Sequence, residues 1–204
     1  MKNIRLTVWI GIMCGWLAAG MLQAGTRPDN ARPAEEDGSR LWLPVMRPVE
    51  GAEVEVIYKG KVSPTIAVAI AELKNAWKGE PVLLEKKRTG QGDGFAITSS
   101  EHQVRILSST EAGLLYGVYS LLRMQAAGQV TVPLSVTEQS VYDLRILNHW
   151  DNPDGTVERG YAGCSLWNWE ELPGTLSPRY EAYARANASV GINGTVLNLS
   201  LIHI

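Results

Sequence analysis

The order of predicted strands and helices over residues 141–198 constrains the fold more than any other feature of this chain. A short apolar strand at 144–147 is followed by a long polar loop, a helix at 178–188 and a second strand that begins at residue 195. Two strands joined through a helix normally lie parallel in one sheet. This order predicts a βα repeat of the kind that builds a (β/α)8 barrel, whose active sites form at the carboxyl ends of the strands.

The residues before this repeat predict a separate α/β layer. Ser63 and Pro64 are typical of a helix N-terminus, Gly79 is expected to cap the end of that helix, and Thr110 opens a second helix. The elements are expected in the order strand, helix, three strands, helix, over residues 53–58, 64–77, 81–84, 95–98, 103–107 and 110–122. Residues 130–140 are expected to form a proline-containing connection at the domain boundary.

The predicted fold class is therefore α/β. A small N-terminal α/β sandwich domain (41–138) precedes the first βα units of a truncated (β/α)8 TIM barrel (141–198). The glycine-rich run at 90–94 lacks the spacing of a phosphate-binding loop and is expected to be a connection. The basic run at 86–88 is expected to lie in a solvated loop.

The first 24 residues have the pattern of a secretory signal peptide. Lys2 and Arg5 precede an apolar run without charges, and Ala24 ends a plausible cleavage site. An uncleaved membrane anchor is the alternative. Cleavage would leave no stable membrane span, a flexible lead-in at 25–40, and a protein that is secreted or periplasmic.

Composition excludes two classes of function. The formal net charge is -2, which argues against a broad basic surface for binding nucleic acid. The two cysteines, Cys14 and Cys164, cannot build a disulfide framework, and no His/Cys cluster indicates a zinc site. Seven tryptophans are compatible with either a core or sugar-stacking surfaces.

Candidate ligand-binding residues follow the strand at 144–147. Trp150 could lie against a pyranose ring, Asp151 and Asn152 could bond hydroxyl groups, and Arg159 could bind a carboxylate. His149 could instead be a core histidine with its hydrogen bonds satisfied.

Each of the neighbouring polar and aromatic residues also has a structural interpretation. Arg159 could pair with Glu158 or Asp151, and Asp154 is expected to cap the loop. Trp167 and Trp169 are expected to pack on a helix. Asp151 and Glu158 are poor candidates for a glycosidase acid and base, because both come from one βα unit.

Two long blocks resemble the glycoside hydrolase family 67 α-glucuronidases. They are residues 148–163, which begin Asn-His-Trp-Asp-Asn, and residues 183–198. Residues 40–43 and 111–118 are similar to the N-terminal domain of that family. The segment 111–118 is also shared with other glycosidases such as hexosaminidases.

The resemblance implies an inverting hydrolase. Such enzymes remove α-1,2-linked glucuronic acid, or its 4-O-methyl ether, from xylo-oligosaccharides derived from glucuronoxylan, need no cofactor or metal, and form homodimers through a C-terminal region. Trp150, Asp151, Asn152 and Arg159 would line or support the uronic-acid pocket. The catalytic carboxylates are expected on later barrel strands, so no residue of this chain is assigned a catalytic role.

Two departures from the family pattern affect the prediction. Cys164 replaces an expected basic residue, and residues 199–204 are an atypical tail, which suggests a truncated chain that is inactive alone. Two alternatives remain open. One is another glycosidase with the same N-terminal domain, hexosaminidase-like in activity; the other is a secreted carbohydrate-binding protein without catalysis.

Overall fold

The computed structural model describes residue 43 and residues 54–88, 92–172 and 174–199. The predicted signal peptide and lead-in, and residues 200–204 of the predicted tail, lie outside the described residues. All described residues belong to one compact unit.

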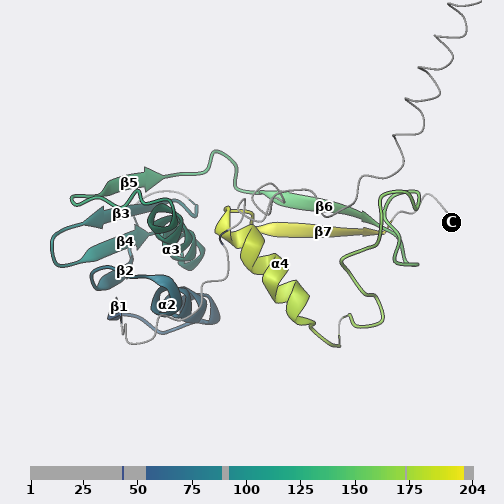
Figure 1. Cartoon of the computed structure of the whole chain (residues 1–204), viewed down its shortest axis with the longest axis horizontal. Coiled ribbons are helices and arrows are strands. Elements are labelled where there is room, and N and C mark those ends of the chain that lie inside the picture. Colours follow the sequence, from purple (N-terminus) through teal and green to yellow (C-terminus); the bar gives the residue numbers. More distant parts are fainter. Residues whose placement is uncertain (1–42, 44–53, 89–91, 173, 200–204) are drawn as a thin grey trace, which may run out of the picture. The chain divides into compact units, whose positions relative to one another are not determined.

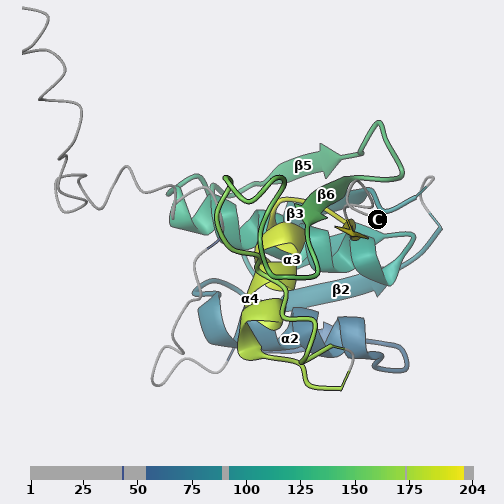
Figure 2. The same cartoon turned by 90° about the vertical axis from the view of Figure 1, so that its right-hand side faces the viewer.

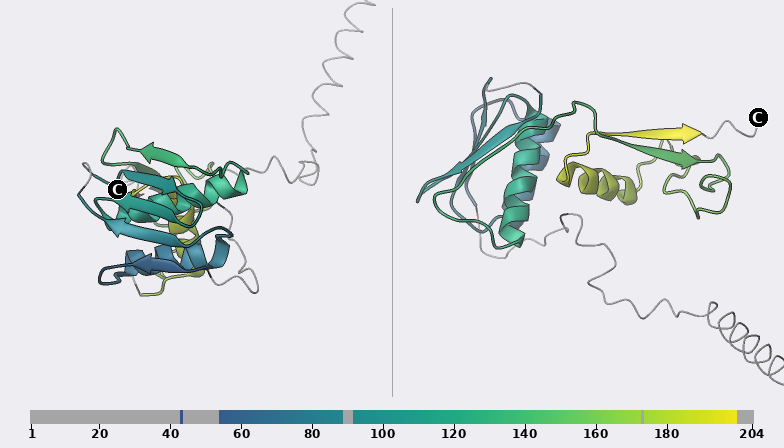
Figure 3. Two further views of the ribbon diagram at one scale, coloured as in Figure 1. Left: turned by 90° about the vertical axis from the view of Figure 1, so that its left-hand side faces the viewer. Right: turned by 90° about the horizontal axis from the view of Figure 1, so that it is seen from above.

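A mixed five-stranded sheet forms the first half of this unit (Figure 1). Its strand order is β1-β2-β4-β3-β5, with β1, β2 and β4 parallel and β3 antiparallel to both of its neighbours. The strands are β1 (Val56–Tyr58), β2 (Val82–Lys86), β3 (Phe95–Ser99), β4 (Val104–Ser108) and β5 (Ser135–Glu138). The helices α2 (Pro64–Ala76) and α3 (Glu111–Ala126) lie on one face of the sheet (Figure 3). This arrangement confirms the predicted α/β class.

Local sequence signals explain where α2 begins, but not where it ends. Ser63 is the N-cap, and its hydroxyl accepts the N–H of Ile66 at 3.3 Å. The helix ends at Ala76 rather than near Gly79, so the predicted glycine cap is wrong. Trp77 takes the C-cap position in an extended conformation, which buries its ring and lets the indole N–H donate to the carbonyl oxygen of Glu80 at 2.8 Å.

The core lies between the sheet and the two helices. Alternate residues of the inner strands point toward the helices, as the two-residue period of a strand requires. The fully buried side chains there include Ile66 and Leu73 from α2, and those of Val82, Leu84, Ile97, Ile106, Leu114, Val118, Leu121 and Leu122 from the strands and α3.

Two glycines allow α3 to approach the sheet closely. A Cβ atom at Gly113 would lie 2.1 Å from Ser108 Oγ and 2.7 Å from the carbonyl oxygen of Asp93. A Cβ atom at Gly117 would lie 2.5 Å from Ile106 Cγ2. The segment 111–118, whose sequence resembles the N-terminal domain of glycosidases, therefore has a packing role in this fold.

The connection predicted at 130–140 contains a strand that the sequence did not indicate. Residues 135–138 form β5, which pairs with β3 from Thr98↔Ser135 to Phe95↔Glu138. The Ser99 hydroxyl also accepts the N–H of Leu134 at 2.8 Å. As an edge strand with little buried surface, β5 has no hydrophobic alternation strong enough to identify it from sequence.

Glu111 links the N-terminal ends of both helices. Its carboxylate accepts the Ser63 hydroxyl at 2.5 Å and the Lys86 ammonium at 2.9 Å. Lys86, expected in a solvated loop, is instead the last residue of β2. The hydrogen bond from Ser63, and then that from Lys86, lower the pKa of Glu111 below 4.5.

This lowered pKa predicts an acid-dependent contribution to stability. A carboxyl group with a lowered folded-state pKa stabilises the protein above its unfolded-state pKa, and that contribution is lost as pH falls through the folded-state pKa. Glu111→Gln should therefore lower the Tm at neutral pH, and the difference from wild type should shrink below about pH 4.5. Thermal unfolding across pH, with the exposed Glu101→Gln as control, tests this; a Tm difference that does not vary with pH would contradict it.

Candidate functional site

The second half of the unit is a βα unit with the predicted order. The strands β6 (Ile146–Asp151) and β7 (Gly194–Leu199) are parallel and are joined through helix α4 (Pro178–Ser189). The pairing runs from Ile146↔Gly194 to Asp151↔Leu199, so both carboxyl ends lie at the same edge. Figures 1 and 2 show the loop after β6 at this edge. The βα order is confirmed; a closed barrel is not shown, because the described residues contribute two strands to this sheet.

β6 is longer than the sequence predicted. The expected strand ended at residue 147, but the ladder continues through Asp151. His149, Trp150 and Asp151 are therefore strand residues, whose side chains alternate between the two faces of the sheet.

The two faces of β6 differ in burial. Leu147, His149 and Asp151 are half-buried or buried, and His149 contacts Tyr183 of α4, so this face meets the helix. Ile146, Asn148 and Trp150 are exposed on the opposite face. Two of the four sequence-predicted site residues, Trp150 and Asp151, therefore point to opposite sides of the strand.

An aromatic cluster surrounds His149 on the helix side. His149 Nε2 lies 2.5 Å from the Tyr183 hydroxyl, and the Trp167 ring meets the imidazole edge-on at 5.5 Å. Trp167 also stacks on Tyr180 of α4 at 5.1 Å, which confirms its predicted role in helix packing. The sequence does not indicate that Tyr183 and His149 are in contact. It places Tyr183 only on the same side of the helix as Tyr180.

Asn152 organises the loop that follows β6. Its side-chain amide donates to the Thr156 hydroxyl at 2.8 Å and to the carbonyl oxygen of Glu158 at 2.6 Å. The Asp154 carboxylate accepts the N–H of Thr156 at 2.9 Å, as expected of a loop cap. Trp169 donates its indole N–H to the carbonyl oxygen of Asn152 at 3.2 Å. The loop is thus held by its own hydrogen bonds.

Trp150 and Arg159 are the predicted site residues that solvent reaches most freely. The Trp150 side chain is 52% exposed, and Arg159 is exposed in the loop. Within the described residues, Arg159 forms no ion pair with Asp151 or Glu158. The Tyr161 hydroxyl instead bonds the Glu158 carboxylate, which raises the pKa of the phenol. The guanidinium of Arg159 is therefore accessible to an anionic ligand.

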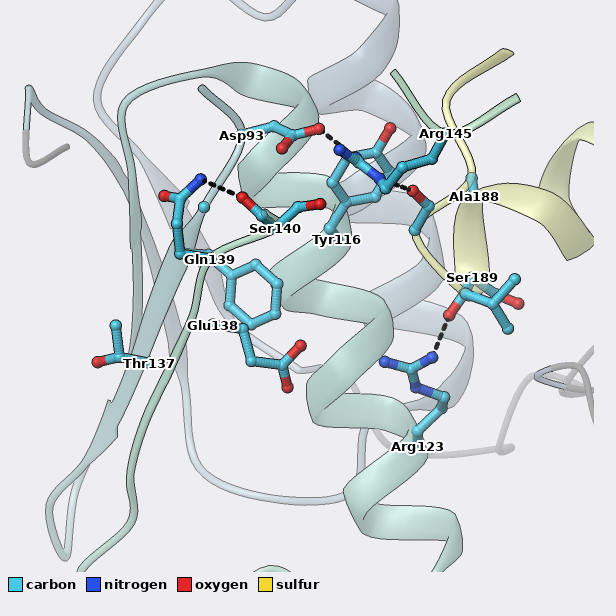
Figure 4. Close-up of a pocket in the computed structure, with 14 residues that line it drawn as sticks. Asp93, Tyr116, Arg123, Thr137, Glu138, Gln139, Ser140, Arg145, Ala188 and Ser189 are labelled. Carbon is cyan, nitrogen blue, oxygen red and sulfur yellow. Dashed lines mark hydrogen bonds and ion pairs between the residues drawn. The ribbon is translucent and has the colours of Figure 1, made fainter. Parts of the chain in front are cut away.

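A second cluster joins the βα unit to the α/β layer. Arg145, which immediately precedes β6, donates to the Asp93 carboxylate and to the carbonyl oxygen of Gly191, both at 2.5 Å (Figure 4). Its guanidinium also lies 5.7 Å from the centre of the Tyr116 ring. The hydrogen bond to Asp93 raises the pKa of Arg145. The glycine-rich run at 90–94 thus contributes Asp93 to an ion pair with Arg145. Both residues line a cavity of about 440 Å³.

A third contact joins α4 to α2. The Arg185 guanidinium bonds both carboxylate oxygens of Glu72, with Nε–Oε1 at 2.6 Å and Nη2–Oε2 at 2.8 Å. Arg185 Nη1 also donates to the carbonyl oxygen of Leu43 at 2.7 Å. Charged groups on α4 and β6 therefore fix the βα unit against the α/β layer.

Among the described residues, no group of three His, Cys, Asp or Glu side chains lies close enough to hold a metal ion. No helix in this part of the chain is both long and apolar enough to cross a bilayer.

Comparison with known proteins shows a similarity to one enzyme family. Residues 124–201 match the glycosyl hydrolase family 67 middle domain. The chain is 39% identical over 107 residues to a probable α-glucuronidase A of Aspergillus clavatus, a match that covers 52% of this chain and 12% of that protein. The chain is therefore similar to glycoside hydrolase family 67 over residues 124–201. The probable α-glucuronidase A of Neosartorya fischeri is 42% identical over 107 residues, with the same coverage.

The chain is also similar to a third fungal α-glucuronidase. The α-glucuronidase A of Aspergillus tubingensis is 38% identical over 106 residues, covering 52% of this chain. The chain spans about 12% of the length of these relatives. These relatives are named α-glucuronidases, and the region that matches the family model, residues 124–201, includes the βα unit described above.

Solved structures resemble the chain only distantly. A family 115 4-O-methyl-α-glucuronidase with specificity for decorated arabinogalactans is 10% identical, with a TM-score of 0.48 over 71% of this chain and 25% of that chain. A family 138 enzyme that targets pectin rhamnogalacturonan II is 16% identical, with a TM-score of 0.42 over 50% of this chain and 17% of that chain. Scores this low establish neither a shared fold nor a function.

Proposed function

We propose that this chain is part of an α-glucuronidase that hydrolyses α-1,2-linked glucuronic acid, or its 4-O-methyl ether, from xylo-oligosaccharides with inversion. The family 67 match and the relatives named α-glucuronidase favour this activity over the hexosaminidase-like alternative. The partner is then an oligosaccharide derived from glucuronoxylan. Secretion or export to the periplasm, and a homodimeric parent protein, belong to the same proposal.

The observation that carries the proposal is the exposure of Trp150 at the carboxyl end of β6. An indole that is 52% exposed on the face opposite α4 presents a flat apolar surface beside a polar loop. A pyranose ring has apolar C–H faces and a rim of hydroxyl groups, so an aromatic ring and neighbouring polar groups suit it. The exposed Arg159 supplies a positive charge for the carboxylate of a uronic acid.

Asp151 and Asn152 have a supporting role in this proposal. Asp151 is 2% exposed on the helix side of β6, and the Asn152 amide is used within the loop. The pair Asp151 and Glu158 therefore does not suit a general acid and base, both of which must reach the glycosidic bond. The catalytic carboxylates are proposed to come from elsewhere in the parent enzyme, and the chain alone is proposed to bind sugar without cleaving it.

Trp150→Ala should weaken sugar binding by about tenfold. The contact of an aromatic ring with a sugar face contributes on the order of 1–2 kcal/mol, and 1.4 kcal/mol corresponds to about a factor of ten. Calorimetric titration of the full chain with a glucuronic-acid-decorated xylo-oligosaccharide measures this. The undecorated oligosaccharide tests whether the acid is recognised.

Tyr142→Ala is the matched control, because Tyr142 is 71% exposed but precedes β6. It should bind the decorated sugar as wild type does. Equal losses in the two variants, or no binding by the wild-type chain, would contradict the assignment of Trp150.

A further inference from the structure

The Asp151 carboxylate is buried without a complete set of hydrogen-bond partners. The residue is 2% exposed, and among the described residues its Oδ2 atom has no hydrogen-bond partner. A buried acceptor left unsatisfied costs about 1–3 kcal/mol, so such an atom in a native structure requires an explanation. The imidazole of His149 lies beside it, with Nδ1 3.6 Å from Oδ2.

The other nitrogen of the same imidazole is also engaged. His149 Nε2 lies 2.5 Å from the Tyr183 hydroxyl, which in turn lies 3.2 Å from the Thr195 hydroxyl of β7. The rings of Trp167 and Tyr183 contact the imidazole edge-on, with interplanar angles of 83° and 61°. The imidazole thus packs against Trp167 and Tyr183, and both of its nitrogens face polar atoms.

We propose that Asp151 is a positioning residue that acts through His149 and not on a ligand. Asp151 keeps the imidazole proton on Nδ1, directed at Oδ2, while the Tyr183 hydroxyl donates to Nε2. The opposite tautomer would direct a nitrogen lone pair at the carboxylate, which is unfavourable in a buried site. The group that faces one nitrogen of a histidine normally decides which nitrogen carries the proton.

This chain of contacts has a consequence for the proposed sugar site. Trp150 lies between His149 and Asp151 in β6 and points to the other face of the sheet. Fixing both neighbours against α4 and β7 fixes the direction of the exposed indole. This part of the inference rests on the proposed function, whereas the tautomer of His149 does not.

The direct test is ¹⁵N NMR of the imidazole groups in the full labelled chain, in mildly alkaline buffer where histidines are ordinarily neutral. The chain has three histidines, and His149→Gln identifies the signal of interest. We expect a protonated-type shift for Nδ1 and an unprotonated-type shift for Nε2. A proton on Nε2 alone would overturn the proposal, because Nδ1 could then not donate to Asp151.

Substitutions separate positioning from a merely structural role. Asp151→Asn keeps an acceptor oxygen and should retain the Nδ1–H tautomer, whereas Asp151→Leu should lose it. Tyr183→Phe removes the donor to Nε2 and should allow exchange between the two tautomers. Glu170→Gln, a charge change at an exposed residue of the same loop, should leave the imidazole signals unchanged.

The same samples distinguish failure of this inference from failure of the proposed function. If the wild-type tautomer is as expected but the decorated xylo-oligosaccharide shifts no Trp150 signal, the sugar assignment fails and the role of Asp151 stands. If Asp151→Leu leaves the Nδ1–H tautomer in place, Asp151 does not control His149 and the inference fails, whatever the sugar does.

Discussion

Arg185→Met is expected to lower the free energy of unfolding by about 3 kcal/mol. Removing one member of a buried ion pair typically costs about 3–5 kcal/mol, because the remaining charge stays buried without its partner. The side chains of Arg185 and Glu72 are 17% and 14% exposed, which places the effect near the lower end of that range. The Tyr119 ring beneath the guanidinium, at 5.8 Å, and the Tyr119 hydroxyl, 3.3 Å from Glu72, would keep the orphaned carboxylate in a confined site.

Urea denaturation of matched variants measures this effect. Arg105→Met breaks an ion pair with Glu85 whose side chains are 44% and 34% exposed, and it should cost less than about 1 kcal/mol. The double variant Arg185→Met/Glu72→Met removes both charges and should recover much of the stability lost by Arg185→Met alone. Equal effects of Arg185→Met and Arg105→Met would show that the contact between α4 and α2 does not hold a buried charge.

The elements with strong local signals were predictable from sequence. Ser63 followed by Pro64, and Thr110 before an apolar stripe, mark helix starts that depend on a few neighbouring residues. The strand β5 was missed because its stability comes from pairing with β3, which is 37 or more positions away in each registered pair. The end of α2 was missed for a similar reason, since burial of Trp77 outweighs the preference for a glycine cap.

The candidate site was predictable in location but not in orientation. The sequence placed polar and aromatic residues at the end of a strand, and the structure places Trp150 and Asp151 there. Because the predicted strand ended at residue 147, the alternation of side chains along residues 148–151 was not predicted. The sequence therefore did not show which of these side chains face α4. The contacts of Arg145 with Asp93, and of His149 with Tyr183, join residues 52 and 34 positions apart, so they follow from the fold and not from any local pattern.

Gly117→Ala is expected to destabilise the protein by about 1–2 kcal/mol, against the intrinsic preference of the helix. In an unconstrained helix, replacing glycine with alanine stabilises by about 1 kcal/mol. At Gly117 the new Cβ would lie 2.5 Å from Ile106 Cγ2 and 3.3 Å from the Phe95 ring. Overpacking of this kind typically costs about 1–3 kcal/mol, occasionally more, and both neighbours lie in a core where rigid side chains have little room to move.

The sign of the effect separates packing from helix propensity. Gly174→Ala, where the nearest atom to the new Cβ is 3.8 Å away, should change stability by less than about 0.5 kcal/mol. Ile106→Leu removes the Cγ2 methyl group that the new Cβ would meet, so Gly117→Ala should cost less in that background than in the wild type. If Gly117→Ala instead stabilises the chain in urea denaturation, α3 does not approach β3 and β4 as closely as described. The glycine pattern of residues 111–118 would then need a reason other than packing, because helix propensity alone favours alanine at both Gly113 and Gly117.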